Sequence, residues 1–248
     1  MLHYFRNLRK SYSTKFLKYA LGEIILVMLG ILFAVQIDNW NQLRIERKKE
    51  LGHLKNLKED LLSNINRLQT LDSIYQYFEA SSDIGIKKLN SNPSVDNILE
   101  IDSLVGTRYA IFPVNRSTYN EMLNDGSFYS IKNQKLRSKI DDFYVRASNE
   151  ENAFIDITRG AEDLHNKEGL NRFQFLIYAL KENIPIHKDF ETEWIKDPNS
   201  ETFLALMTYF IYTQSQSNRA RRMIIARYTN KAQEMIEAID LELKSREN

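Results

Sequence analysis

The chain has no cysteine and little glycine or proline. The lack of cysteine excludes disulfide frameworks, thiolate metal sites and cysteine nucleophiles. Eight glycines and four prolines in 248 residues leave few places where a helix must end. We therefore expect an all-α protein rather than one built from short strands and turns.

Common catalytic motifs are missing as well. The sequence has no G-x-S-x-G elbow, no P-loop, no G-x-G-x-x-G and no H-E-x-x-H, so the usual hydrolase, nucleotide and zinc sites lack their signatures. The formal net charge is only +1, and residues 38–248 carry slightly more acids than bases. Nucleic acid is not an expected partner, because phosphate binding needs a clear basic excess. We predict a protein that is not an enzyme and has no cofactor.

One long hydrophobic run is present near the N-terminus. No polar side chain occurs from Ile24 to Val35. Extended to residues 19–37, the run would span about 28 Å at about 1.5 Å per residue, close to the hydrocarbon thickness of about 30 Å. A soluble core helix or a cleaved signal peptide is the alternative, but the run lacks an A-x-A cleavage pattern. We predict an uncleaved transmembrane helix over residues 19–37.

The flanks of this run support the prediction and suggest an orientation. Tyr19 and Trp40 stand where interfacial aromatic rings belong, and the leader at residues 1–18 carries five bases and no acid. The positive-inside rule then places the N-terminus in the cytoplasm and the domain at residues 38–248 in the periplasm. Lipid bilayer is thus the first expected partner.

Glu23 is the unusual residue of the predicted span. It lies one turn from the start, so its side chain can reach the headgroups. Alternatively, Glu23 and Gly30 are seven residues apart, and Gly30 with Ala34 forms a small-xxx-small pair that lets two backbones approach. This second interpretation predicts a homo-oligomer formed through the span.

The same region carries a family resemblance. The matching string is Lys18-Tyr19-x-x-Gly22-Glu23-Ile24-x-Leu26-Val27-x-x-Gly30-Ile31-x-x-Ala34-x-Gln36-Ile37-x-Asn39-Trp40-Asn41. It resembles the signature of a bacterial family of single-pass membrane proteins, domain of unknown function 6090. A second block, Phe112-Pro113 and residues 118–126, is similar to that family more loosely. The resemblance implies a bacterial inner-membrane protein and supplies no reaction.

Three long helices are expected after the span. Apolar residues recur in steps of three and four over residues 39–90, 133–167 and 201–243. The first could form a coiled coil between protomers, but Lys58 and Asp72 fall on that seam, which favours packing within the chain. We therefore expect an elongated bundle of about three long helices with small helical inserts.

Short polar signals mark where some helices begin. Asn133 is expected to cap the second long helix, and Thr118 with Glu121 has the spacing of a capping box. The string Pro198-Asn199-Ser200-Glu201 predicts the start of the third long helix.

Two inserts interrupt the long helices. Residues 91–132 are expected to form a distal insert at the tip of the first helix. If the helix at 133–167 returns antiparallel to the first, residues 169–198 form a membrane-proximal lobe. Phe173 and Trp194 of this lobe would then touch lipid headgroups or, alternatively, close the proximal end of the core.

A polar layer is the main candidate site. Charged residues interrupt the apolar faces of two long helices near their midpoints: Glu150, Glu151, Arg219, Arg221 and Arg222. Such a layer can be an anion or ligand site, or a set of ordinary paired surface charges. If it is a layer, we expect Arg221 or Arg222 to pair with Glu150 or Glu151.

These patterns favour an interaction or scaffold protein of the bacterial envelope with a protein partner that the sequence does not identify. A periplasmic small-molecule sensor or ligand-binding bundle is the alternative. The third candidate is a di-metal carboxylate enzyme, suggested by the Glu-x-x-His steps Glu50/His53 and Glu162/His165.

Overall fold

The computed structural model describes residues 2–91, 93–104, 110–165, 170–185 and 192–247. Within these ranges the chain forms helices and no strand, which confirms the all-α prediction. The chain divides into two units, Met1–His53 and Leu54–Asn248.

The first unit is the N-terminal part of helix α1, which runs Leu2–Ser91. Every residue from Ile24 to Val35 is exposed, although none has a polar side chain. The described residues contain one helix that is long and apolar enough to cross a membrane, and none of its apolar window is buried. A signal sequence passes the same test of length and composition, so this helix is a candidate membrane span.

In the second unit, the rest of α1 buries one face. Its inward side chains are spaced by three and four residues, as an amphipathic helix requires. They are Leu54, Leu57, Leu61, Ile65, Leu68, Leu71 and Tyr75. This stripe packs against two further long helices, α4 (Gln134–His165) and α7 (Ser217–Glu247).

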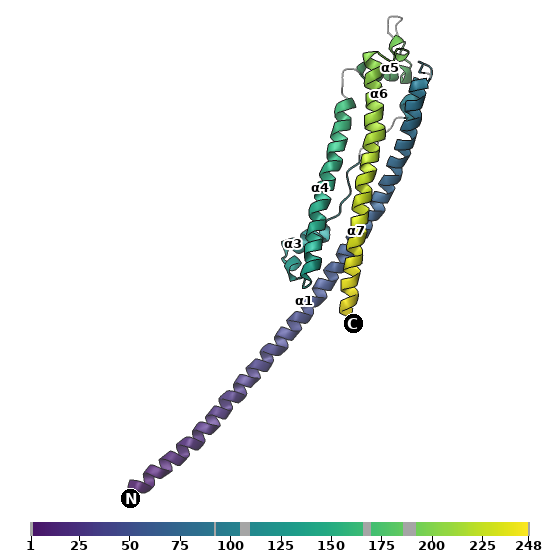
Figure 1. The fold of residues 1–248 in the computed structure, drawn as a ribbon. Coiled ribbons are helices and arrows are strands. Elements are labelled where there is room, and N and C mark those ends of the chain that lie inside the picture. The colour runs from purple at the N-terminus through teal and green to yellow at the C-terminus, as the bar shows by residue number, and fades with distance from the viewer. Residues whose placement is uncertain (1, 92, 105–109, 166–169, 186–191, 248) are drawn as a thin grey trace. The chain divides into compact units, whose positions relative to one another are not determined.

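Helix α7 runs antiparallel to both other long helices (Figure 1). Four contacts fix the directions: Lys58–Asp240 and Asp72–Arg222 for α1, and Asn133–Glu242 and Thr158–Arg221 for α4. Because α7 is antiparallel to both, α1 and α4 are parallel to each other. The prediction that residues 133–167 return antiparallel to the first helix is therefore wrong.

The segment between α1 and α4 makes this parallel arrangement possible. It contains α2 (Ile98–Leu104), α3 (Ser117–Asn124) and the short 3-10 helix η1 (Ser127–Ser130). Helix α2 packs near Leu89 at the C-terminal end of α1, whereas the backbone amide of Thr118 donates to Asp60, about eight turns earlier in that helix. The described parts of residues 91–132, here called the crossing segment, therefore contact α1 both at its C-terminal end and about eight turns earlier, and they are not a distal insert.

A separate apolar cluster closes one end of the second unit. It combines α5 (Asn171–Lys181), the 3-10 helix η3 (Glu193–Ile195) and α6 (Glu201–Tyr209) with the end of α1 and with α2. Its buried members are Leu89, Ile98, Ile101, Leu170, Phe173, Leu176, Ile177, Trp194, Ile195, Phe203, Leu206 and Phe210. Trp194 is 4% exposed, so this ring is part of the protein core.

The position of this cluster corrects a second prediction. The membrane-proximal position expected for residues 169–198 depends on an antiparallel α4. In the structure these residues follow the far end of a parallel α4 and contact Leu89, at the C-terminal end of α1. The expected contact of Trp194 with lipid headgroups loses its basis.

The last long helix is not a single α-helix. Between α6 and α7 lies η4, a π-helix over Phe210–Gln216. The hydroxyl of Ser217 donates to the carbonyl oxygen of Tyr212 at 2.7 Å. The helix predicted over residues 201–243 therefore continues through this region with a wider turn. Its predicted start is confirmed, since the Ser200 hydroxyl accepts from the Phe203 amide at 3.2 Å.

Candidate functional site

The centre of the second unit contains a fully buried arginine. Arg221 is the fifth residue of α7 after the π-helix, it lies on the inward face of α7, and its exposed fraction is 0%. Its Nη1 donates to Asn218 Oδ1 at 3.2 Å, and its Nη2 donates to Thr158 Oγ1 of α4 at 3.3 Å. The charge is thus brought into the bundle core, where an uncompensated ion would be costly.

Two aromatic rings compensate part of that cost. The guanidinium carbon of Arg221 lies 5.3 Å from the ring centroid of Tyr75 and 5.8 Å from that of Phe154. These distances fall in the cation–π range, and desolvation strengthens the attraction. Tyr75 comes from α1 and Phe154 from α4, so Arg221 links all three long helices.

The π-helix places a second unusual contact next to this arginine. A Cβ built on Gly160 of α4 would stand 3.3 Å from the hydroxyl of Tyr212, which lies in η4. Gly160 therefore gives the Tyr212 ring room to approach α4. π-helical turns are rare and often occur at functional sites, which makes this region a candidate site.

An ion-pair cluster joins α7 to α1 beside the buried arginine. Arg222 donates from Nε to Asp72 at 3.1 Å and from Nη1 to Glu79 at 2.9 Å, and Arg219 donates to Glu79 at 2.9 Å. Burial alone would raise the pKa of Glu79, but hydrogen bonds from Arg222 and Arg219 and their positive charges hold it below its ordinary value. The cluster therefore favours the ionised carboxylate.

The predicted acidic partners face elsewhere. Glu150 accepts two hydrogen bonds from Arg227, at 3.0 and 2.8 Å, and Glu151 accepts from Arg116 at 2.8 Å. The hydrogen bond to Glu150 is the largest cause of the raised pKa of Arg227. The expected pairing of Glu150 or Glu151 with Arg221 or Arg222 is thus replaced by other pairs.

Helix register explains the difference. In the antiparallel pair α4·α7, Thr158 is the neighbour of Arg221, so Glu150, two turns before Thr158, comes level with Arg227. Arg222 is one residue further round α7 and faces α1 instead. The structure therefore brings Arg219 and Arg222 of α7 together at Glu79 of α1, and it leaves Arg221 in the core. Glu150 and Glu151 pair with other arginines.

A polar cluster that the sequence analysis missed fixes the crossing segment. Asn64 of α1 is fully buried; its side chain donates to the Asn115 carbonyl oxygen and to the Tyr228 hydroxyl, and accepts from the Asn115 amide at 2.8 Å. Burial raises the pKa of Tyr228 to about 12. Asp60 accepts from the Asn115 side chain and from the Thr118 amide.

This cluster corrects the capping prediction at the start of α3. The backbone amide of Thr118 at the start of α3 donates to Asp60 of α1, and the side chain of the N-cap residue Arg116 makes no capping hydrogen bond. A sequence signal for Asn64 existed, since this residue lies between Leu61 and Leu68 on the apolar stripe of α1. The cap predicted at Asn133 is confirmed, because its Oδ1 accepts from the Leu136 amide at 3.1 Å.

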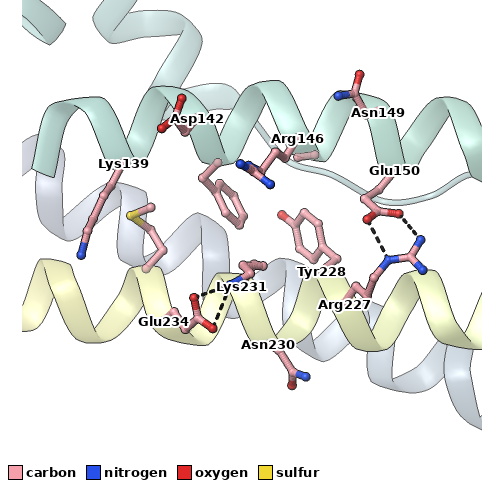
Figure 2. Close-up of a pocket in the computed structure, with 13 residues that line it drawn as sticks. Lys139, Asp142, Arg146, Asn149, Glu150, Arg227, Tyr228, Asn230, Lys231 and Glu234 are labelled. Atoms are coloured by element: carbon pink, nitrogen blue, oxygen red, sulfur yellow. Dashed lines mark hydrogen bonds and ion pairs between the residues drawn. The ribbon is translucent and has the colours of Figure 1, made fainter. Parts of the chain in front are cut away.

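A groove lies between α4 and α7 (Figure 2), and residues of both helices line it. Its volume is about 660 Å³. Buried apolar and aromatic side chains form the floor: Phe143, Ala147, Tyr228 and Met235. Charged pairs Glu150–Arg227 and Lys231–Glu234 lie along the edges. The size is within the range of about 300–1,000 Å³ found for small-molecule sites.

The residues predicted for the membrane span lie in the first unit. Gly22, Glu23, Gly30, Ala34, Asn39 and Trp40 are all exposed along α1. A Cβ added at Gly22 or Gly30 would meet nothing within 4 Å, so these glycines have no packing role within one chain. The predicted seam between two copies stays a prediction.

The metal hypothesis concerns two Glu-x-x-His steps. Across the residues that the structure describes, no group of three or more His, Cys, Asp or Glu side chains is arranged to hold a metal ion. The side chain of His165 lies outside the described part of the chain, so the step Glu162/His165 stays untested.

Comparison with known proteins gives one match. The sequence profile of a family of unknown function, DUF6090, matches residues 23–151, which is more than half of the chain. The matched part covers most of α1, the crossing segment and the first half of α4. No curated protein and no solved structure matches the chain.

Proposed function

We propose that this chain, which belongs to the family of unknown function DUF6090, is a single-pass protein of a bacterial inner membrane with a helical scaffold domain. The observation that carries the proposal is the exposed apolar stretch of α1 from Ile24 to Val35. A continuous apolar surface of this kind is costly in water and is satisfied by a bilayer. The charged surface of the second unit suits an aqueous compartment.

The orientation follows from the leader. Its bases are Arg6, Arg9, Lys10, Lys15 and Lys18. With these in the cytoplasm, residues 38–248 are periplasmic. The three long helices α1, α4 and α7 then act as an elongated bundle that presents its surface to a protein partner of the envelope. Gly30 and Ala34 supply a contact between two copies within the bilayer.

Orientation and anchoring are tested together by a fusion. Alkaline phosphatase fused after Asn248 should be active, and it should remain in the membrane fraction after alkaline carbonate extraction. A fluorescent reporter that matures only in the cytoplasm should be dark at the same position. An inactive phosphatase with a bright reporter would overturn the periplasmic placement, and release by carbonate would overturn the anchor.

The scaffold role is tested by capture of the tagged full chain from native membranes and identification of co-purifying proteins. An unrelated single-pass protein, expressed at the same level and carrying the same tag, is the control. A protein retained by this chain in repeated captures, and absent from the control, supports the scaffold role. Capture of nothing above the control, together with a bound metabolite, would favour a sensor instead.

A second candidate function is favoured by a separate observation, the groove between α4 and α7. Its volume of about 660 Å³ and its buried apolar floor suit a small ligand. A periplasmic sensor or ligand-binding bundle anchored by α1 would use such a site.

A further inference from the structure

We propose that the groove between α4 and α7 binds a small organic anion that combines an apolar body with a carboxylate or phosphate group. Such a ligand would give the chain the ligand-binding role described above, so the site rests on that second function. Membrane anchoring and partner capture do not depend on it.

The charges of the groove select an anion. Within the groove, Arg227 is neutralised by Glu150 and Lys231 by Glu234. Lys139 and Arg146 of α4 remain, and among the described residues no acid pairs with either. Figure 2 shows Lys139 reaching from α4 toward α7 and Arg146 lying between the two helices. Asp142 is the third acid of the lining, so four bases stand against three acids in the groove. The groove therefore has surplus positive charge.

The spacing of these cations defines the shape of the ligand. Lys139 and Arg146 are seven residues apart on one helix, which places them about 10.5 Å apart along its axis at about 1.5 Å per residue. Phe143, which also lines the groove, comes four residues after Lys139 and three before Arg146, a spacing that puts the three on one face of α4. The guanidinium of Arg146 can hold a carboxylate or phosphate through two parallel hydrogen bonds. The apolar body would then lie over Phe143 toward Lys139.

The floor favours a small molecule over a second protein. Phe143, Tyr228 and Met235 are 6%, 2% and 6% exposed, so the apolar area left open in the groove suits a small apolar body and is too small for a protein partner. A stable protein interface buries about 800 Å² on each partner. A second copy placed on a twofold axis through the groove would also bring Lys139 against Arg146, which is a repulsive contact.

The test is a calorimetric titration of octanoate into the full chain in phosphatidylcholine nanodiscs, with empty discs as the reference. Saturable binding of octanoate is expected, and acetate, which has the charge without the apolar body, should bind at least tenfold more weakly. Arg146→Gln should weaken octanoate binding about tenfold, because a charge-assisted contact is lost. Lys139→Gln should weaken it about threefold.

A matched control is available one turn earlier on α4. Lys135 is exposed and lies outside the groove lining, so Lys135→Gln should leave the octanoate affinity unchanged. Equal affinities for the Lys135 and Arg146 variants, or no saturable heat above empty discs, would overturn the proposal. All three positions are exposed, and thermal melting followed by circular dichroism verifies that the variants are folded.

The same anionic chemistry is also present in lipid headgroups. Repeating the titration in phosphatidylglycerol discs distinguishes the two sources. If a lipid headgroup competes for the groove, the unmodified chain should bind octanoate more weakly in phosphatidylglycerol than in phosphatidylcholine. The Arg146→Gln variant should then bind octanoate equally in both lipids. This pair of results assigns the groove to a lipid headgroup. Unchanged binding assigns it to a free anion.

Discussion

Helix α1 is one continuous helix with two different surfaces. Its stretch from Ile24 to Val35 exposes apolar residues all round, whereas its part within the second unit buries a single apolar stripe, mostly of leucines, and leaves polar residues outside. A helix that is apolar all round needs either a core or a bilayer, and a helix with one apolar stripe needs only a partner helix. The pattern of side chains alone thus separates the two environments.

The largest expected effect tests the buried stripe. Leu68 is 0% exposed, and Leu68→Ala should lower the free energy of unfolding of the second unit by about 2–5 kcal/mol. Leu62→Ala, at a side chain that is 42% exposed, should cost far less. Leu26→Ala in the apolar stretch should cost nothing. Urea unfolding followed by the emission of Trp194 in a Trp40→Phe background measures all three, and similar losses at Leu62 and Leu68 would contradict the comparison.

A charge in the apolar stretch should act on membrane insertion instead. Met28→Arg should make insertion less favourable by about 2.5–3.5 kcal/mol, because a charged side chain near mid-span is costly. Ile84→Arg, at a half-exposed position of the second unit, should leave insertion unchanged. Carbonate extraction of membranes reports the difference. An unchanged membrane fraction for Met28→Arg would argue against a span.

A smaller effect concerns the pairs that hold α1 to α7. Arg222 and Glu79 should show a coupling of about 1 kcal/mol in a double-mutant cycle, whereas Arg222 and Glu150 should behave additively. The pKa of Glu79 is lower in the folded protein than its ordinary value of 4.5. The ionised carboxylate therefore contributes its full share to the free energy of unfolding above pH 4.5, and this share disappears as the pH falls through the lower folded pKa. Glu79→Gln should therefore reduce the loss of stability on acidification. Coupling between Arg222 and Glu150 would contradict the pairs described here and would support the polar layer predicted from the sequence.

The smallest effect is expected for self-association. Gly30→Leu should weaken it, because a bulky side chain separates backbones that Gly30 and Ala34 let touch. Gly52→Leu is the control, since a Cβ at Gly52 also meets nothing within 4 Å and this residue lies outside the apolar stretch. A membrane two-hybrid assay compares the two. Equal association for both variants would contradict the predicted seam between two copies. The other interpretation of Glu23, a side chain that reaches the lipid headgroups, would then remain.

Local signals in the sequence predicted much of the structure, apart from the capping box at Thr118 and Glu121. The caps at Asn133 and Ser200 involve residues three positions apart, and the leucine stripe of α1 repeats within each turn. Both depend on neighbours in the chain, so the sequence contains all the necessary information. The helical class and the starts of two long helices followed from these signals.

Long-range register could not be predicted in the same way. The direction of α4 depends on the crossing segment, which is held by Asp60 and Asn64 of α1. Nothing near Asn115 in the sequence indicates those partners. Likewise, Glu150 pairs with Arg227 rather than Arg222 because of how α4 and α7 are aligned, and Arg222 has acids of α1 within reach. Charge type alone did not distinguish these partners.

The π-helix at Phe210–Gln216 acts like an insertion of one residue into a regular helix. One residue of an α-helix corresponds to a rotation of about 100°. If residues 210–216 formed a regular α-helix instead and the earlier part stayed fixed, each later residue would move into the place of the one after it. Ala220 would enter the aromatic clamp of Arg221, and Arg221 would take the place of Arg222 opposite Glu79. The charge pattern between α1 and α7 therefore depends on the wider turn that accommodates the additional residue.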